Sequence, residues 1–341
     1  MSTRGLARQT IVLVIAGLVF STCTSTPADL DPATAARPRV GLASAEAAEP
    51  GGGRLTFDSD RTGNHEIYTL DLESLESRQL TADPSFDSWW ARTSPDRSRI
   101  LFYRTPRGVR DTDYTQTSLW IMDADGENQR VLRPRGAEGW ELQGHADWSP
   151  DGRQLVMAGG RSANTQLFIT DDQGKNARQI TDRGGMSLDP SWSPDGETIV
   201  FAGCAAAICF QKDYEIFTIS SEGGPATQLT SNTVREHDPY FSPDGSQIAW
   251  LAETEAPVLS WGTSVWNLRI MDRDGKKQRK LTDDRHINSL PQWSRDGSRI
   301  FFHRFERGKT DRWNLYSIRP DGSGLTEIAP DAPGNNVFPS P

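Results

Sequence analysis

The stretch Asp189-Pro-Ser-Trp-Ser-Pro-Asp-Gly-Glu-Thr-Ile-Val-Phe201 contains a turn motif followed by an apolar strand. In its Ser-Pro-Asp-Gly segment, proline presets φ for a turn, aspartate can bond its own backbone, and glycine tolerates the turn's closing conformation. The Ile-Val-Phe run that follows is typical of a buried strand. The stretch therefore predicts two strands joined by a tight hairpin turn.

Related stretches recur along the chain. Residues 145–156 and 238–250 are close copies, whereas 93–102 and 291–302 are degenerate ones. The turn serines stand at positions 94, 149, 193, 242 and 294, which gives steps of 55, 44, 49 and 52 residues. Each turn is followed by an apolar strand, an alternating strand, a glycine turn and a short closing strand that ends near Leu-Thr. Four short strands repeated at about 45 residues are typical of a β-propeller.

We predict an all-β, six-bladed β-propeller with four antiparallel strands per blade. Residues 55–81 supply the second, third and fourth strands of one blade but no first strand, and residues 336–341 resemble an inner strand broken off at a Ser-Pro turn. We therefore expect the C-terminal strand to join the N-terminal blade and close the ring, because closure removes exposed sheet edges. A frayed tail is the alternative, and Pro339 favours it by removing a ladder donor.

The first 53 residues have a different character. Arg4 and Arg8 precede the apolar run 11–20, which is too short to span a bilayer but suits the core of a signal peptide, here assigned to residues 1–23. Cys23 follows this run as in the lipobox of bacterial lipoproteins, although Phe20 and Thr22 depart from that pattern. A lipid on Cys23 and cleavage to a soluble periplasmic form both stay open. Residues 24–53 predict a disordered tether, which leaves 54–341 for the propeller.

Composition restricts the partners. Of 341 residues, 35% are hydrophobic and 24% charged, as in a globular protein, and the formal net charge is −9. An acidic chain lacks the basic face that binds phosphates, so we expect no nucleic acid partner. The only membrane contact expected is a lipid on Cys23, and we expect a monomer.

The stretch Asp58-Ser-Asp-Arg-Thr-Gly-Asn-His-Glu-Ile-Tyr68 and the Trp-Ser-Pro-Asp-Gly copies resemble the WD-like repeats of TolB-type propellers. The resemblance covers roughly residues 54–341 and implies an exported, protein-binding component of the cell envelope. TolB carries a folded α/β domain before its propeller, whereas residues 24–53 are too short and too polar to form one.

The topology of a propeller divides its loops between two rims. Turns between first and second strands, and between third and fourth strands, lie on one rim, which here has only tight turns; we name it the tight-turn rim. Second-to-third loops and blade-to-blade links lie on the other, the long-loop rim. Its insertions are residues 103–118, 133–144, 203–213, 253–265 and 304–312. Long loops on a rigid scaffold often bind ligands, so we predict the long-loop rim as the functional face.

Aromatic, histidine and aspartate side chains of this rim are the candidate binding residues: Trp89, Trp90, Trp140, His145, His237, Asp238, Trp261 and His286. The tryptophans could stack on a sugar or on an aromatic residue of a partner. Asp147, Asp189 and Asp238 could form a carboxylate ring, but bonds to the backbone of neighbouring blades are the favoured interpretation.

A metal site is the alternative use of His145, His237 and His286, since the similar oligogalacturonate lyases hold a metal through channel histidines. These histidines stand four, five and eight residues before their turn serines, so they need not converge. We therefore expect no metal and no cofactor.

The chain lacks the motifs of a Ser nucleophile elbow, a zinc protease and a phosphate loop. We expect binding rather than catalysis: an exported protein, periplasmic or lipid-anchored, that binds a protein partner of the cell envelope through its long-loop rim. A metal-dependent carbohydrate-active enzyme that uses the channel histidines is the alternative.

Cys204 and Cys209 flank four residues in a loop between two strands that should pair. This spacing lets their Cα atoms approach to the ~4.4–6.8 Å that a disulfide requires. An exported protein meets an oxidising compartment. We predict a disulfide between them.

Overall fold

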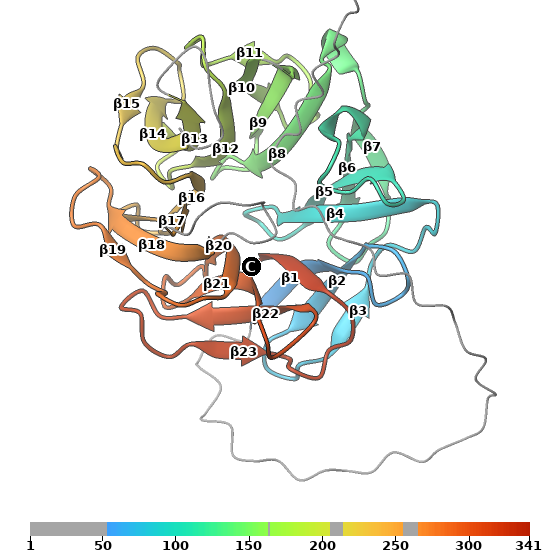
Figure 1. Ribbon diagram of the computed structural model, residues 1–341. Coiled ribbons are helices and arrows are strands. Elements are labelled where there is room, and N and C mark those ends of the chain that lie inside the picture. Colours follow the sequence, from blue (N-terminus) through green and yellow to red (C-terminus); the bar gives the residue numbers. More distant parts are fainter. Residues whose placement is uncertain (1–52, 163, 205–213, 255–264) are drawn as a thin grey trace, which may run out of the picture.

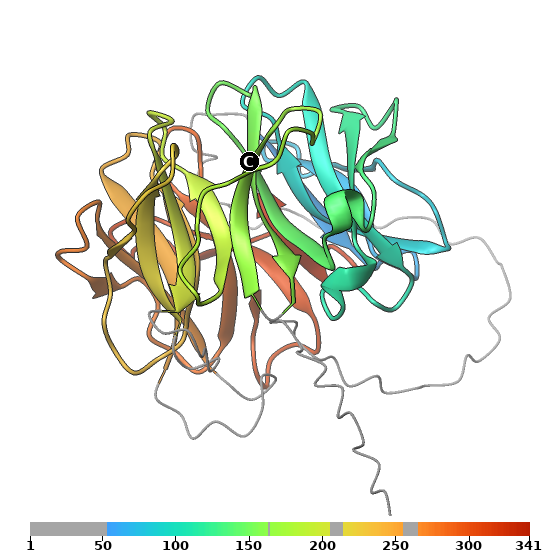
Figure 2. The same cartoon turned by 90° about the horizontal axis from the view of Figure 1, so that it is seen from above.

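The computed structural model describes residues 53–162, 164–204, 214–254 and 265–341, and arranges their strands as sheets around a central channel (Figure 1). The signal peptide and nearly all of the tether lie outside the described residues. Figure 2 shows the sheets from the side, with their strands running between the two rims. In the described part of the chain, no helix is long and apolar enough to cross a membrane.

The strands follow the sequence repeat, and in each repeat the first strand lies nearest the channel. The strands of the first part of the chain are β1 (Arg54–Ser59), β2 (Glu66–Asp71), β3 (Ser77–Gln79), β4 (Phe86–Thr93), β5 (Arg99–Pro106), β6 (Ser118–Asp123), β7 (Arg130–Arg133), β8 (Leu142–Trp148), β9 (Gln154–Arg161), β10 (Asn164–Asp171), β11 (Arg178–Gln179), β12 (Ser187–Trp192), β13 (Thr198–Cys204), β14 (Tyr214–Ser220) and β15 (Thr227–Gln228).

The remaining strands are β16 (Glu236–Phe241), β17 (Gln247–Glu253), β18 (Trp266–Asp272), β19 (Arg279–Lys280), β20 (Ile287–Trp293), β21 (Ile300–Phe305), β22 (Trp313–Ile318), β23 (Thr326–Ile328) and β24 (Asn336–Ser340). Two short 3-10 helices, η1 (Tyr114–Gln116) and η2 (Ala137–Gly139), lie in long-loop segments.

The prediction of six blades, each with four antiparallel strands, is wrong. Among the described residues, four sheets have four strands and a fifth has eight, because the repeats β16–β19 and β20–β23 share one sheet. Trp266 of β18 pairs in parallel with Ile287 of β20. Asn288 fixes this junction by donating from Nδ2 to the Trp266 carbonyl over 2.9 Å. The ring thus consists of four separate four-stranded blades and one double sheet.

The C-terminal strand completes the N-terminal blade. β24 pairs antiparallel with β1, and the sheet order is β24-β1-β2-β3. Asp60 accepts the Asn335 backbone N–H at 2.7 Å and its side-chain amide at 2.6 Å. Val337 and Phe338 are buried. The expected closing strand is therefore confirmed, and the alternative of a frayed tail is wrong.

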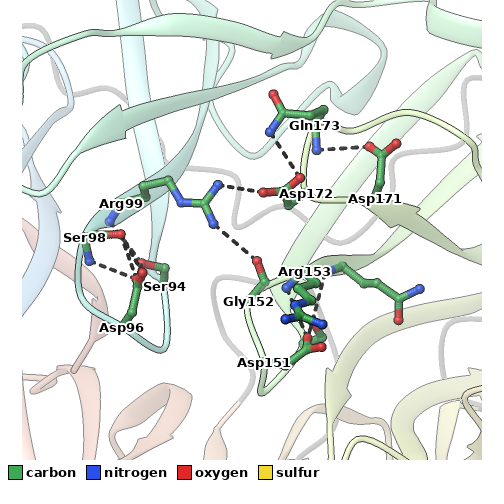
Figure 3. A network of polar contacts seen from close by, with 12 residues as sticks. Ser94, Asp96, Ser98, Arg99, Asp151, Gly152, Arg153, Asp171, Asp172 and Gln173 are labelled. Carbon is green, nitrogen blue, oxygen red and sulfur yellow. Dashed lines mark hydrogen bonds and ion pairs between the residues drawn. The ribbon is translucent and has the colours of Figure 1, made fainter.

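The Ser-Pro-Asp-Gly turns satisfy their own polar groups, as Figure 3 shows for the degenerate copy at Ser94. Ser94 Oγ donates to Asp96 Oδ1 over 2.6 Å and accepts the backbone N–H of Arg99 at 3.0 Å. Asp96 also accepts the Ser98 N–H at 3.0 Å, and these hydrogen bonds lower the pKa of Asp96 to about 2. The serine-to-aspartate bond recurs at Ser149–Asp151, Ser193–Asp195, Ser242–Asp244 and Ser294–Asp296.

Side chains of this rim also connect neighbouring repeats. The Arg99 guanidinium donates to Asp172 over 2.9 Å and to the Gly152 carbonyl over 3.2 Å (Figure 3), and it lies 4.7 Å above the Trp148 ring. Arg273 likewise donates to Asp195 over 2.8 Å. The charged groups of the tight-turn rim are thus used to hold the fold together.

Candidate functional site

Each innermost strand contains a β-bulge, and the bulge places one side chain at an equivalent point of the ring. The pairing of every inner strand shifts register there. The bulge residue has a φ of 51° to 55°, which is unusual for residues other than glycine. Because a bulge bends its strand and re-aims a side chain, these positions can face the channel. They are Trp90, His145, Asp189, Asp238, Leu290 and Phe338.

Five of these residues, all except Leu290, line a cavity of about 80 Å³. In the order of the ring, the polar residues His145, Asp189 and Asp238 are neighbours, and the other three positions are apolar. The cavity lies toward the long-loop rim, because Tyr114 of the 107–117 loop and Trp266, the first residue of β18, also line it. We name it the channel-mouth cavity.

Asp189 is the centre of the polar half. Its Oδ1 pairs with His145 Nδ1, and its Oδ2 accepts from His237 Nδ1 at 2.9 Å. The Asp238 backbone N–H adds a longer bond of 3.4 Å to Oδ2. Burial would raise the pKa of Asp189, but the two histidines outweigh it and hold this pKa well below its usual range. Asp189 is therefore a carboxylate anion.

His145 lies between the Asp189 carboxylate and the Tyr114–Asp111 pair. Its Nε2 lies 2.8 Å from Tyr114 Oη, and Tyr114 donates its single proton to Asp111 Oδ1 over 2.5 Å. Tyr114 must then accept from His145 Nε2, while Nδ1 forms an ion pair with the Asp189 carboxylate, so the ring is an imidazolium. Burial alone would lower the pKa of His145, but Asp189, Asp238 and Asp111 raise it above its ordinary value.

Two residues beyond the bulge residue Trp90, strand β4 carries Arg92, which is 2% exposed. Its guanidinium donates to Tyr240 Oη over 2.9 Å and lies 4.3 Å from the centre of the Trp90 ring. At the corresponding position of β8, desolvation raises the pKa of the partly buried Asp147 to about 6. A buried cation therefore lies next to the Trp90 ring that lines the cavity.

Four predicted binding residues, Trp90, His145, His237 and Asp238, meet at the channel-mouth cavity. Trp90 stacks on the His145 ring, with 4.7 Å between ring centres. Trp89 instead is fully buried and packs in the core against Tyr103 and Tyr114.

Trp140 and His286 lie elsewhere on the rim. Trp140 borders a separate surface hollow, packs on Phe168 and lies under the Arg133 guanidinium. His286 accepts the Arg307 N–H at 3.1 Å and does not line the channel-mouth cavity. Trp261 lies outside the described residues.

The three histidines do not form the alternative metal site, since His286 is apart from the other two. Among the described residues, no group of three or more His, Cys, Asp or Glu side chains is arranged to hold a metal ion. The interpretation that the aspartates bond to neighbouring backbone fits Asp147, which accepts the Trp148 and Trp192 N–H groups. Asp189 also accepts one such bond, from the Asp238 N–H at 3.4 Å, but its carboxylate binds two histidines as well.

Cys204 ends β13, is buried and is disulfide-bonded. Cys209 lies outside the described residues, as does Cys23, so the pairing of Cys204 with Cys209 and the lipid on Cys23 stay predictions.

Sequence reasoning missed the roles of Asp111, Tyr114 and Phe338 at the cavity. One signal in the sequence was available for the ring: Trp90, His145, Asp189, Asp238 and Leu290 each stand four residues before a turn serine. That common offset marks the bulge position. His237, at an offset of five, joins the site because its ring reaches Asp189 from the neighbouring strand.

Comparison with known proteins agrees with this architecture. Residues 105–257 match the family model of the TolB beta propeller domain. No curated protein matches the chain significantly in sequence.

Solved structures are similar to the chain in fold. TolB from Acinetobacter baumannii has a TM-score of 0.66 at 17% identity, over 85% of this chain and 67% of that one. A TolB-type protein of Agrobacterium tumefaciens has a TM-score of 0.62 at 17% identity, over 85% and 94%. An oligogalacturonate lyase in complex with manganese has a TM-score of 0.55 at 17% identity, over 82% and 74%. These likenesses show the β-propeller fold.

Proposed function

We propose that this chain is an exported binding protein of the cell envelope, and that it binds a protein partner at the long-loop rim through the channel-mouth cavity. The observation that carries the proposal is the hydrogen-bonded and ion-paired network Asp189–His145–Tyr114–Asp111 at the wall of a cavity that is also lined by five apolar side chains. Buried charges cost stability unless they are paired, so an arrangement of this kind at an opening favours a binding role.

The cavity suits one inserted side chain better than a threaded segment. Its volume is about 80 Å³, and the buried Arg92 of β4 bonds to Tyr240 of β16 nearby. The network fixes the side chains of the polar half before a partner arrives, and pre-organisation of this kind lowers the entropic cost of binding. Binding energy in interfaces is concentrated in a few anchors that fill desolvated pockets. The likeness to TolB propellers supports a partner in the envelope.

Export belongs to the same proposal. The charged start, apolar run and small residues of 1–23 support a signal peptide. An intact mass of the mature protein from envelope fractions tests this part: a diacylated Cys23 supports a lipid anchor, removal of Cys23 supports the soluble form, and an unprocessed Met1 contradicts export.

Site-specific photo-crosslinking in cells tests the binding face. A photoreactive residue is placed at Asp311, exposed in the 306–312 loop of the long-loop rim, and separately at Arg153, exposed in a turn of the opposite rim. We expect one envelope protein, identified by mass spectrometry, to crosslink from Asp311 and not from Arg153. Equal crosslinking from both positions, crosslinking from Arg153 alone, or cleavage of oligogalacturonate by purified protein with manganese would contradict the proposal.

A further inference from the structure

Asp238 differs from the other acidic residues at the channel mouth. Its carboxyl group lines the cavity and makes no hydrogen bond or ion pair with another side chain of the described residues, whereas its backbone N–H bonds to Asp189. Asp189 binds two histidines, and Asp111 accepts from Tyr114. A carboxylate in such surroundings is stabilised by a cation that enters the cavity.

Carboxyl groups are crowded around the cavity. Three carboxyl groups, Asp111, Asp189 and Asp238, lie there near the His145 imidazolium and the Arg92 guanidinium, and burial together with the Asp189 charge raises the pKa of Asp238 well above its usual range. Arg110, also close to Asp111, is paired with Asp58 over 3.4 Å. A cation that enters beside Asp238 would therefore stabilise the charged form of this carboxyl group.

Five apolar residues line the rest of the wall, together with the polar residues His237, Asn288 and Ser289. Trp90, Leu251, Trp266, Ile287 and Phe338 line it, and each is buried. The cavity of about 80 Å³ is several times the roughly 10–15 Å³ that holds one water molecule. It therefore has room for a charged head together with part of an alkyl stem.

We propose that the channel-mouth cavity binds the alkylammonium end of a lysine side chain of the partner, with the Asp238 carboxylate as its counter-ion and the apolar wall around its methylene groups. This rests on the proposed function, since it names the group that the partner inserts. Lysine combines a compact ammonium with an apolar stem, which matches a cavity with one available carboxylate and an apolar half.

Two other cations fit less well. An arginine fork needs paired acceptors in a plane, and Asp189 and Asp111 are already engaged. A calcium ion takes about six to eight oxygen ligands, and the described residues provide no group of three or more metal-binding side chains. A cation–π site is also not the basis of recognition, because the Trp90 ring already contacts His145 and Arg92.

Calorimetric titration of the purified full-length chain with Nα-acetyl-lysine methylamide tests the proposal without any partner. The matched ligand is Nα-acetyl-norleucine methylamide, which has a similar stem but no charge. The variant Asp238→Asn removes the counter-ion and keeps a residue that tolerates positive φ. The control Asp311→Asn removes one charge from the same rim, at an exposed position outside the cavity.

We expect the lysine ligand to bind the wild-type protein and Asp311→Asn equally, at least tenfold more weakly to Asp238→Asn, and at least tenfold more tightly than the norleucine ligand. Equal binding of both ligands would overturn the proposal, because the cavity would then recognise only the apolar stem. Absence of lysine binding, or displacement of the ligand by equimolar Ca²⁺, would overturn it as well. Either outcome leaves the crosslinking test of the binding face unaffected, so the two proposals fail separately.

Discussion

Aspartate has two different roles at the two ends of the inner strands. Asp195 lies in a turn of the tight-turn rim, where it accepts from Ser193, from the Glu197 N–H and from Arg273. Asp189, on the strand before that turn, instead holds two buried histidines at the channel mouth. Asp195 has counterparts in the other repeats, whereas the position of Asp189 holds a different side chain in nearly every repeat.

The difference between the two ends separates scaffold from site. At the tight-turn rim, both the backbone and the side chains repeat, because the turn itself requires the serine and the aspartate. At the bulge, only the backbone repeats, with φ near 50° whether the residue is Trp90, Asp189 or Leu290. The fold therefore fixes where these side chains stand and leaves their chemistry free to vary.

The largest expected effect is at the channel mouth. Asp189→Asn leaves the His145 imidazolium without its counter-ion, and removal of one partner of a buried pair costs about 3–5 kcal/mol. Because the folded protein raises the pKa of His145, the stability gained from its protonation is complete below about pH 6.5 and is lost as the pH rises through the folded pKa. Chemical unfolding should thus show a larger loss at pH 6 than at pH 9. An equal loss at both values would mean that His145 is not the charged partner.

Asp147→Asn, two residues beyond His145 on β8, is expected to raise the free energy of unfolding rather than lower it. Burial raises the pKa of Asp147 to about 6, so ionisation of this group opposes folding above its unfolded pKa of about 3.9. Asp147→Asn should therefore stabilise the protein by up to ~2 kcal/mol at pH 7.5 and change little at about pH 3.5, below the unfolded pKa. Denaturant melts at the two pH values measure this, and destabilisation at pH 7.5 would show that the Asp147 charge is needed.

A smaller effect is expected at the tight-turn rim. Asp195→Asn weakens the hydrogen bonds from Ser193 and Arg273 in a partly exposed turn, which should cost about 1 kcal/mol at pH 7. The Asp195 pKa is lowered to about 2, so its stabilisation is present above the unfolded pKa of about 3.9 and disappears as the pH falls through about 2. Unfolding measured from pH 7 to pH 3 should show the difference between wild type and variant shrinking. A loss as large as that of Asp189→Asn would remove the distinction between the two ends.

The repeat in the sequence was sufficient to predict the strands, the turns and the closing strand β24, because each depends on local patterns or on the need to cover a sheet edge. The count of blades could not be predicted, since the joined sheet depends on the contact of Asn288 with Trp266. Four site residues were found from their place before the inner strands. Asp111 and Tyr114 were not, because their positions are set by the 107–117 loop, which has no counterpart in the repeat.

The central claim is that binding belongs to the channel mouth and that the tight-turn rim only supports the fold. The most direct test measures the affinity of the crosslinked partner, by calorimetry at pH 7.5, for Asp238→Asn and for Asp244→Asn, the turn aspartate that follows it. We predict at least tenfold weaker binding for Asp238→Asn with undiminished stability. Asp244→Asn should bind as wild type while its free energy of unfolding falls by about 1 kcal/mol. Unchanged affinity in Asp238→Asn together with weakened binding in Asp244→Asn would contradict the claim.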